Sequence, residues 1–145
     1  MSESQRAVYM AFIAALVAPL NEPQAKRQVS PRFLAEIKPD QSSLPMQRFN
    51  FQQFIVEVKR LHEAFPDFAQ NVTVPTILQD GNVLQAIYQM TVTFTRNLKS
   101  RDGRTTFEPN GAKIVIPQTD TVTFADGKIE KFTVQIDSRN ILKHL

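Results

Sequence analysis

The chain has 145 residues, which suits a single domain large enough to bury a hydrophobic core. Its net charge of +3 is small and scattered, and no basic stripe with interleaved aromatic residues predicts nucleic-acid binding. The absence of cysteine excludes disulfides, thiolate metal sites and cysteine nucleophiles. The two histidines, His62 and His144, lie far apart in sequence and predict no metal site.

The first third of the chain is predicted to be mainly helical. Residues 3–18 form an amphipathic helix, because apolar side chains recur along it at helical spacing. Its apolar run, residues 7–18, is too short to span a bilayer and is not read as a signal peptide, so we expect a cytoplasmic protein. A short second helix covers residues 22–28. Residues 33–38 are either a short extended piece or a single helical turn.

A third helix is predicted from a capping residue, Asn50, to about Ala64. Its apolar side chains form one stripe, which His62 joins. A strand over residues 68–78 follows, and Pro75 marks it as an edge strand or a bulged one. The longest strand covers residues 83–96. One face of this strand is apolar and the other carries threonine and glutamine. The apolar face comprises Leu84, Ala86, Tyr88, Met90, Val92 and Phe94.

A polar loop over residues 97–111 precedes two more strands, residues 112–124 and 128–136, and a terminal turn over residues 137–145. Asp-Gly is a hairpin turn signal, because glycine adopts positive φ without steric cost. We predict a three-residue loop with Gly127 left-handed. This register pairs Phe124 with Lys128, Val122 with Glu130 and Asp120 with Phe132.

The predicted hairpin has an apolar face that carries two carboxylates, Asp120 and Glu130. A carboxylate that points into apolar surroundings costs free energy unless it has a partner or a function. The layout is therefore three helices followed by a meander of four antiparallel strands, with the helices on the apolar face of the sheet. The threonine and glutamine face is either hydrated or the contact surface of a homodimer.

Several short motifs, in this order and spacing, resemble the SnoaL-like branch of the NTF2-like superfamily. The resemblance covers about residues 48–145. It implies an α+β, cone-shaped barrel with three N-terminal helices on a curved antiparallel sheet, a deep apolar pocket and homo-oligomers. The motifs are Ala64-Phe65-Pro66-Asp67-Phe68, Gln79-Asp80-Gly81-Asn82-Val83, Asp120-x-x-x-Phe124-x-Asp126-Gly127-Lys128-Ile129, and Asp137 followed by Ile141-Leu142-x-x-Leu145.

The resemblance also implies an activity. The family includes cofactor-free polyketide cyclases, and its relatives include isomerases, dehydratases and epoxide hydrolases. Its acid/base aspartate precedes the turn glycine by seven residues, which is the position of Asp120. The chain departs from the family pattern where a histidine is usual, in Thr93-Phe94-Thr95-Arg96, and in the last strand, where Lys131 replaces a glutamate and Thr133 an aromatic residue. Lys38 corresponds loosely to another family histidine.

Proton transfer beside a carbonyl needs a base for the C–H proton and donors for the enolate oxygen. Asp120 is the expected base, and Tyr88 and Gln118 are the expected hydrogen-bond donors. Glu130 is the second carboxylate, expected to pair with a basic residue near the mouth of the pocket, such as Lys38 or Arg32. No metal or coenzyme is needed. The expected walls for a flat hydrophobic ligand are Met90, Phe94, Val122 and Phe132, with His62 either in the core or beside the pocket.

Two classes of function follow. One is a cofactor-independent cyclase or isomerase that acts on a hydrophobic polycarbonyl compound, such as a polyketide or terpenoid-like metabolite. The other is a non-catalytic small-molecule carrier or a dimeric interaction module on the same fold. Asp120 is a catalytic group in the first and a hydrogen-bonded core residue in the second.

Overall fold

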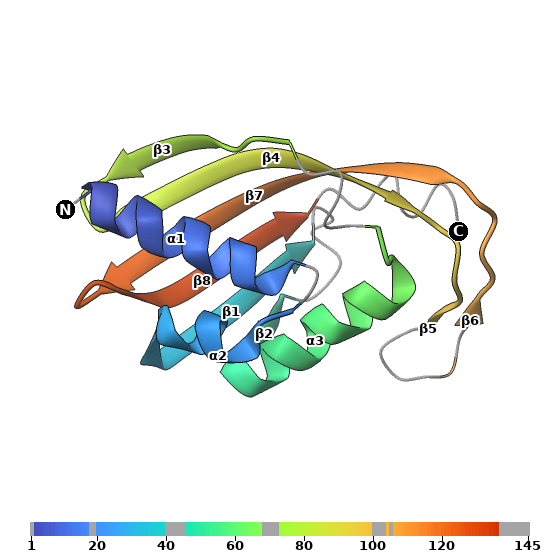
Figure 1. Cartoon of the computed structure of the whole chain (residues 1–145), viewed down its shortest axis with the longest axis horizontal. Coiled ribbons are helices and arrows are strands. Elements are labelled where there is room, and N and C mark those ends of the chain that lie inside the picture. The colour runs from blue at the N-terminus through green and yellow to red at the C-terminus, as the bar shows by residue number, and fades with distance from the viewer. Residues whose placement is uncertain are drawn as a thin grey trace.

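Figure 1 shows the computed structural model, which describes residues 2–17, 20–39, 46–67, 73–99, 104 and 106–136. The terminal turn predicted over residues 137–145 lies outside the described residues, as does the beginning of the strand predicted over residues 68–78. The helices are α1 (Ser2–Leu16), α2 (Glu22–Arg27) and α3 (Phe51–Ala64). The strands are β1 (Val29–Pro39), β2 (Gln47–Phe49), β3 (Thr76–Asp80), β4 (Val83–Thr93), β5 (Leu98–Lys99), β6 (Thr106–Phe107), β7 (Lys113–Ala125) and β8 (Lys128–Ile136).

Six of these strands form one curved sheet in the order β2-β1-β8-β7-β4-β3. The predicted antiparallel meander is confirmed as β3-β4-β7-β8. The sheet is nevertheless mixed, because β1 pairs with β8 in parallel. Its two edges, β2 and β3, do not meet, so the expected barrel is an open curved sheet (Figure 1). The described part of the loop predicted over residues 97–111 contains a small hairpin, β5-β6.

Strand β1 is the main element that the sequence did not define. It has 11 residues, whereas only residues 33–38 were considered as an extended piece. Ser30-Pro31 predicts an interruption of regular secondary structure, because proline cannot donate to the hydrogen-bond ladder of a strand. In the structure the register of β1 against β8 shifts between Val29 and Leu34, and this irregularity accommodates the proline.

The core lies between the sheet and helices α1 and α3 (Figure 1). The helix α3 begins with a capping box, in which Asn50 and Gln53 each bond the backbone N–H of the other. Phe12 of α1 packs on Phe54 of α3 and on Phe132 of β8, with ring centroids 6.2 and 5.2 Å apart. These aromatic contacts attach both helices to one face of the sheet. In the described part of the chain, no helix is both long and apolar enough to cross a membrane.

The β7–β8 hairpin differs from its predicted register. Its loop has two residues, Asp126 and Gly127, with φ of 53° and 77°, as in a type I′ turn. A bulge at Glu130 then shifts the ladder between Thr123 and Phe124. As a result Asp120 pairs with Val134, Val122 with Phe132, and Phe124 with Ile129. The bulge leaves Glu130 without a partner in the ladder, and it turns Ile129, which was predicted to point away, into the core.

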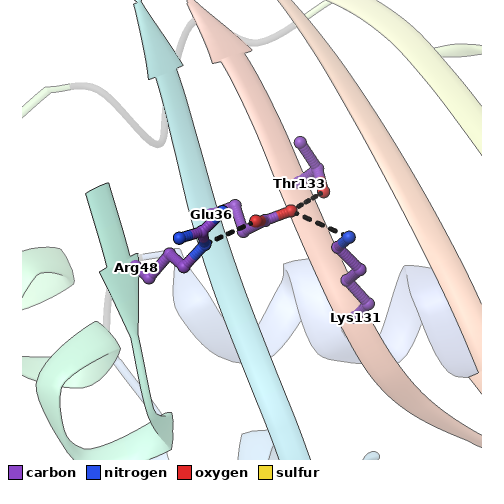
Figure 2. A network of polar contacts seen from close by, with 4 residues as sticks. All are labelled: Glu36, Arg48, Lys131 and Thr133. Carbon is purple, nitrogen blue, oxygen red and sulfur yellow. Dashed lines mark hydrogen bonds and ion pairs between the residues drawn. The ribbon is translucent and has the colours of Figure 1, made fainter. Parts of the chain in front are cut away.

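The opposite face of the sheet carries the predicted threonine and glutamine side chains and a charged network (Figure 2). The carboxylate of Glu36 on β1 is only 4% exposed. It accepts hydrogen bonds from Arg48 of β2 (3.0 Å) and Thr133 of β8 (3.2 Å), and it forms an ion pair with Lys131 (3.1 Å). Burial alone would raise the pKa of Glu36, but these three partners lower it below its ordinary value. The network therefore joins three neighbouring strands across the parallel pair.

Candidate active site

Asp120 lies in the middle of β7 on the side of the sheet that the helices cover. Its neighbours across the ladder are Ala86 of β4 and Val134 of β8, both buried. Asp120 itself is 0% exposed. The predicted orientation of this carboxylate into apolar surroundings is thus what the structure shows. The expected pocket is not open at Asp120 itself, because the carboxylate is completely enclosed.

Three uncharged side chains hold the carboxylate. Tyr9 of α1 donates a hydrogen bond of 2.7 Å to Oδ2, and Tyr88 of β4 donates to the same oxygen at 3.0 Å. Gln118, two residues earlier on β7, donates from Nε2 to Oδ1 at 3.3 Å and to the Tyr88 hydroxyl at 2.5 Å. The structure therefore brings together Asp120, Tyr88 and Gln118, as the strand pattern predicts, and adds Tyr9 from a helix. We call these four residues the carboxylate cluster.

The electrostatics of the cluster follow from burial. Burial raises the pKa of Asp120 from its ordinary value of 3.8 to about 6, against the opposing effect of hydrogen bonds from Tyr9, Gln118 and Tyr88. Burial, together with the negative charge of Asp120, raises the pKa of both tyrosines above the ordinary value. At neutral pH the carboxylate is therefore mostly ionised, and both hydroxyls keep their protons and act as donors.

The carboxylate cluster comes nearest to solvent in the row of residues next to Asp120 on the same face of the sheet. Tyr88, Gln118 and Ile136 form the next row of the same sheet face, and each is only partly buried. The row that contains Asp120 is fully covered. A ligand that approaches the carboxylate would therefore meet Tyr88 and Gln118 first.

The expected apolar walls divide into two groups. Val122 and Phe132 belong to the main core with the aromatic side chains of α1 and α3. Met90 and Phe94 belong to a second cluster farther along β4, packed on Ile114 and Ile116 of β7. Ile136 packs against both clusters and lies beside Gln118 in the ladder. All four predicted wall residues face the helices, and two lie on each side of the Tyr88 row.

Three other predicted site residues lie away from Asp120. Nε2 of His62 is 2.8 Å from the backbone oxygen of Leu16, so this nitrogen carries the proton and the ring joins α3 to the end of α1. Lys38 is exposed on the opposite face of the sheet, because it continues the outward alternation of Glu36 and pairs with Gln135. Lys38 lies opposite Gln135, which is five residues along β8 from Glu130, so the expected pairing of Glu130 with Lys38 is wrong.

Tyr9 was predicted only as one residue of the apolar helix stripe. Its hydroxyl distinguishes it from Phe12 of that stripe, and a buried tyrosine hydroxyl usually has a polar partner. No periodicity, however, specifies which sheet residue a helix side chain meets across 111 positions. Glu36 was missed for a related reason, since its strand was not predicted. Among the described residues, no three His, Asp or Glu side chains lie close enough together to hold a metal ion.

Comparison with known proteins supports the fold. No protein-family model and no curated protein sequence matches the chain. Solved structures do match over almost its full length. A candidate SnoaL-like polyketide cyclase from Jannaschia sp. CCS1 superimposes with a TM-score of 0.78 and 14% identity, over 98% of this chain and 91% of that one. IdmH, a candidate polyketide cyclase from Streptomyces antibioticus, gives a TM-score of 0.75 and 14% identity, over 97% and 96% of the two chains.

A third similar structure is named for a different activity. AclR, a candidate hydroxylase from Streptomyces galilaeus, superimposes with a TM-score of 0.73 and 17% identity, over 99% of this chain and 84% of that one. The chain therefore has the fold of these SnoaL-like and NTF2-like structures, which is the fold that its motifs indicate. The fold alone does not decide the reaction, because one fold supports several chemistries.

Proposed function

We propose that the protein is a cofactor-independent acid–base catalyst for a hydrophobic carbonyl compound, of the cyclase or isomerase type. The observation that carries the proposal is the set of partners around Asp120. A buried carboxylate with only a structural role is usually paired with a cation. Here its hydrogen bonds come from two hydroxyls and an amide, and these leave the negative charge uncompensated.

In the proposed reaction, the enclosure around Asp120 opens at the row of Tyr88 and Gln118, and Asp120 removes a proton from the carbon next to a ligand carbonyl. The electron pair of that C–H bond moves onto the carbonyl oxygen and forms an enolate. Tyr88, which no longer donates to the now protonated Asp120, turns its hydroxyl proton to this enolate oxygen. In a cyclisation the enolate carbon then attacks a second carbonyl carbon of the same molecule, and protonated Asp120 returns its proton to the resulting alkoxide. In an isomerisation the proton returns to a different carbon. Tyr9 and Gln118 position the carboxylate.

The raised pKa of Asp120 favours this role. A carboxylate with an ordinary pKa is a weak base, whereas one near 6 is a stronger base that is still ionised at neutral pH. The surrounding apolar side chains also exclude water from the enolate. The walls on either side of Tyr88 fit a flat, hydrophobic ligand such as a polyketide-like or terpenoid-like polycarbonyl compound.

The test is proton exchange on a simple aromatic ketone. Wild-type protein is incubated with 2-tetralone in D2O, and deuterium uptake at the benzylic carbon beside the carbonyl is followed by NMR. Wild type should accelerate uptake, and Asp120→Asn should lose that acceleration by on the order of 10²-fold, because the shape is kept and the base is removed. Asp80→Asn is the matched control, because Asp80 is exposed at the end of β3. Equal exchange by wild type and Asp120→Asn would reject the proposed function.

A non-catalytic carrier is the second candidate function. It is favoured by the position of Lys131, which replaces the usual family glutamate and whose side chain lies on the far face of the sheet, in the ion pair with Glu36. The described residues therefore supply one buried carboxylate on the helix side, not two. A carrier would bind the same class of hydrophobic compound without accelerating proton exchange.

We also propose a homodimer formed by the outer sheet face. Several apolar side chains are exposed on this face, Leu78 at 54%, Ile87 at 44% and Val115 at 38%, and they lie on the adjacent strands β3, β4 and β7. Light scattering of wild type and Ile87→Lys tests this proposal. A dimer that becomes a monomer in the variant is expected, and a monomeric wild type at high micromolar concentration would contradict it.

A further inference from the structure

Gln118 has one buried polar atom that the carboxylate cluster does not satisfy. Its amide nitrogen donates to both Asp120 and Tyr88. Its amide oxygen, Oε1, is buried and accepts no hydrogen bond from the residues that the structure describes. Gln79 Oε1 is in the same state, but Gln79 lies on the edge strand β3 against Gln5 of α1. An unpaired buried acceptor is unfavourable, so a group that donates to it is stabilised there.

The amide cannot satisfy its oxygen by turning over while Asp120 is ionised. Turning the amide would place Oε1 at the present position of Nε2, 3.3 Å from the Asp120 oxygen, and two acceptors would then face each other. It would also remove a hydrogen bond from the carboxylate. The contacts of Nε2 with the carboxylate thus commit Oε1 to the opposite direction. Gln118 Oε1 is thus an acceptor of fixed direction next to Asp120, and it suits a hydrogen-bond donor on a ligand.

We propose that Gln118 Oε1 accepts a hydrogen bond from a hydroxyl group of the ligand, and that the protein therefore selects hydroxylated aromatic or enolic compounds. This inference rests on the proposed function for the position of the ligand beside Asp120. Gln118 lies in the partly exposed row with Tyr88 and Ile136, where a ligand reaches the cluster. The Tyr88 hydroxyl donates to Asp120 and accepts from Gln118 Nε2, so Gln118 Oε1 is the unpaired acceptor of this row.

An unpaired acceptor beside a base matches ligands that carry a carbonyl and a hydroxyl close together. The hydroxyl donates to Gln118 Oε1, and the carbonyl acidifies the neighbouring carbon whose proton Asp120 removes. Phenols with an ortho or peri carbonyl, β-hydroxy ketones and the enol forms of 1,3-dicarbonyl compounds carry this pair. A ligand whose hydroxyl is methylated keeps the same shape and loses the donor, so it leaves Oε1 unpaired.

The test compares 1-naphthol with its methyl ether, 1-methoxynaphthalene. The chain contains no tryptophan, so naphthalene fluorescence reports binding directly. Wild type should bind the naphthol about fivefold to tenfold more tightly than the ether, the effect of one hydrogen bond. Gln118→Met should bring this ratio close to one, and Gln118→Leu serves as a second variant if the first does not fold. Gln135→Met is the matched control, because Gln135 is exposed on β8 and should keep the wild-type ratio.

Each other outcome overturns the inference. Equal affinities in wild type would show that no ligand hydroxyl is recognised, and failure of both compounds to bind would show that the site does not admit this class. A preference that survives in Gln118→Met and disappears in Asp120→Asn would assign the acceptor to the carboxylate instead. The binding assay involves no reaction, so it fails or succeeds separately from the deuterium-exchange test of the proposed function.

Discussion

The hydroxyl of Tyr9 donates a 2.7 Å hydrogen bond to Asp120, and the two residues are 111 positions apart in the chain. The bond links the first helix to the centre of the sheet. Gln5, one turn earlier on α1, likewise contacts Gln79 of β3. The polar side chains of α1 thus align the helix over the sheet, while its apolar side chains supply most of the contact with the core.

Replacing Tyr9 by phenylalanine should destabilise the protein by about 1–3 kcal/mol, because it leaves a buried carboxylate with one donor fewer. The loss of this bond should also raise the pKa of Asp120 further, since the bond now lowers it. Urea unfolding measures the first effect. Phe12→Leu changes only apolar packing, so it is the control for the effect on the pKa of Asp120. It should leave the pH dependence of the stability unchanged. A Tyr9→Phe variant as stable as wild type would contradict the role of this bond.

The raised pKa of Asp120 makes stability depend on pH in a defined direction. Its folded pKa of about 6 exceeds the ordinary value of 3.8, so the folded state binds the proton more tightly. The resulting stabilisation is fully present below about pH 4 and is lost as pH rises through 6. Relative to Asp120→Asn, wild type should therefore lose roughly 2 kcal/mol between pH 4 and pH 7. Urea unfolding of both proteins at these two pH values measures the difference, and a pH-independent difference would contradict the assignment.

Glu36 should show the opposite pH dependence. Its lowered pKa means that its contribution to stability is present above about pH 4.5 and is lost as pH falls through the folded pKa. Glu36→Gln should destabilise the protein by about 1–3 kcal/mol at pH 7, because the charge-assisted bonds to Arg48 and Lys131 are lost. Glu22→Gln is the control. Its ion pair with Lys59 is 3.8 Å long and both side chains are well exposed, so a change within about 0.5 kcal/mol is expected.

The β7–β8 turn should require glycine at position 127. Its φ of 77° is in the left-handed region, and a Cβ built there meets no atom within 4 Å. Gly127→Ala should therefore cost about 1–2 kcal/mol through backbone conformation alone. Asp126→Asn, at the other turn position, should be nearly neutral, because asparagine tolerates positive φ. Thermal unfolding distinguishes the two variants, and an unaffected Gly127→Ala would contradict the type I′ turn.

The strand faces could be predicted well from the sequence because side-chain alternation is a local property. Tyr88, Gln118 and Asp120 fall on one face by counting in twos, and the structure joins them by hydrogen bonds. Alternation fails at a bulge, where one extra residue reverses the face. This is why Glu130 was placed beside Asp120 and Ile129 was placed outside. The partner of Tyr9 depended on how a helix crosses the sheet, which no local pattern contains.

The parallel pairing of β1 with β8 has a consequence for synthesis on the ribosome. Glu36 and Thr133, which this pairing joins, are separated by 97 positions. When β1 leaves the exit tunnel its parallel neighbour β8 does not yet exist, so the edge of this partly apolar strand that faces β8 stays unpaired. Contacts of this range slow folding and expose nascent chains to aggregation. We therefore expect chaperones to hold the nascent protein until β8 emerges.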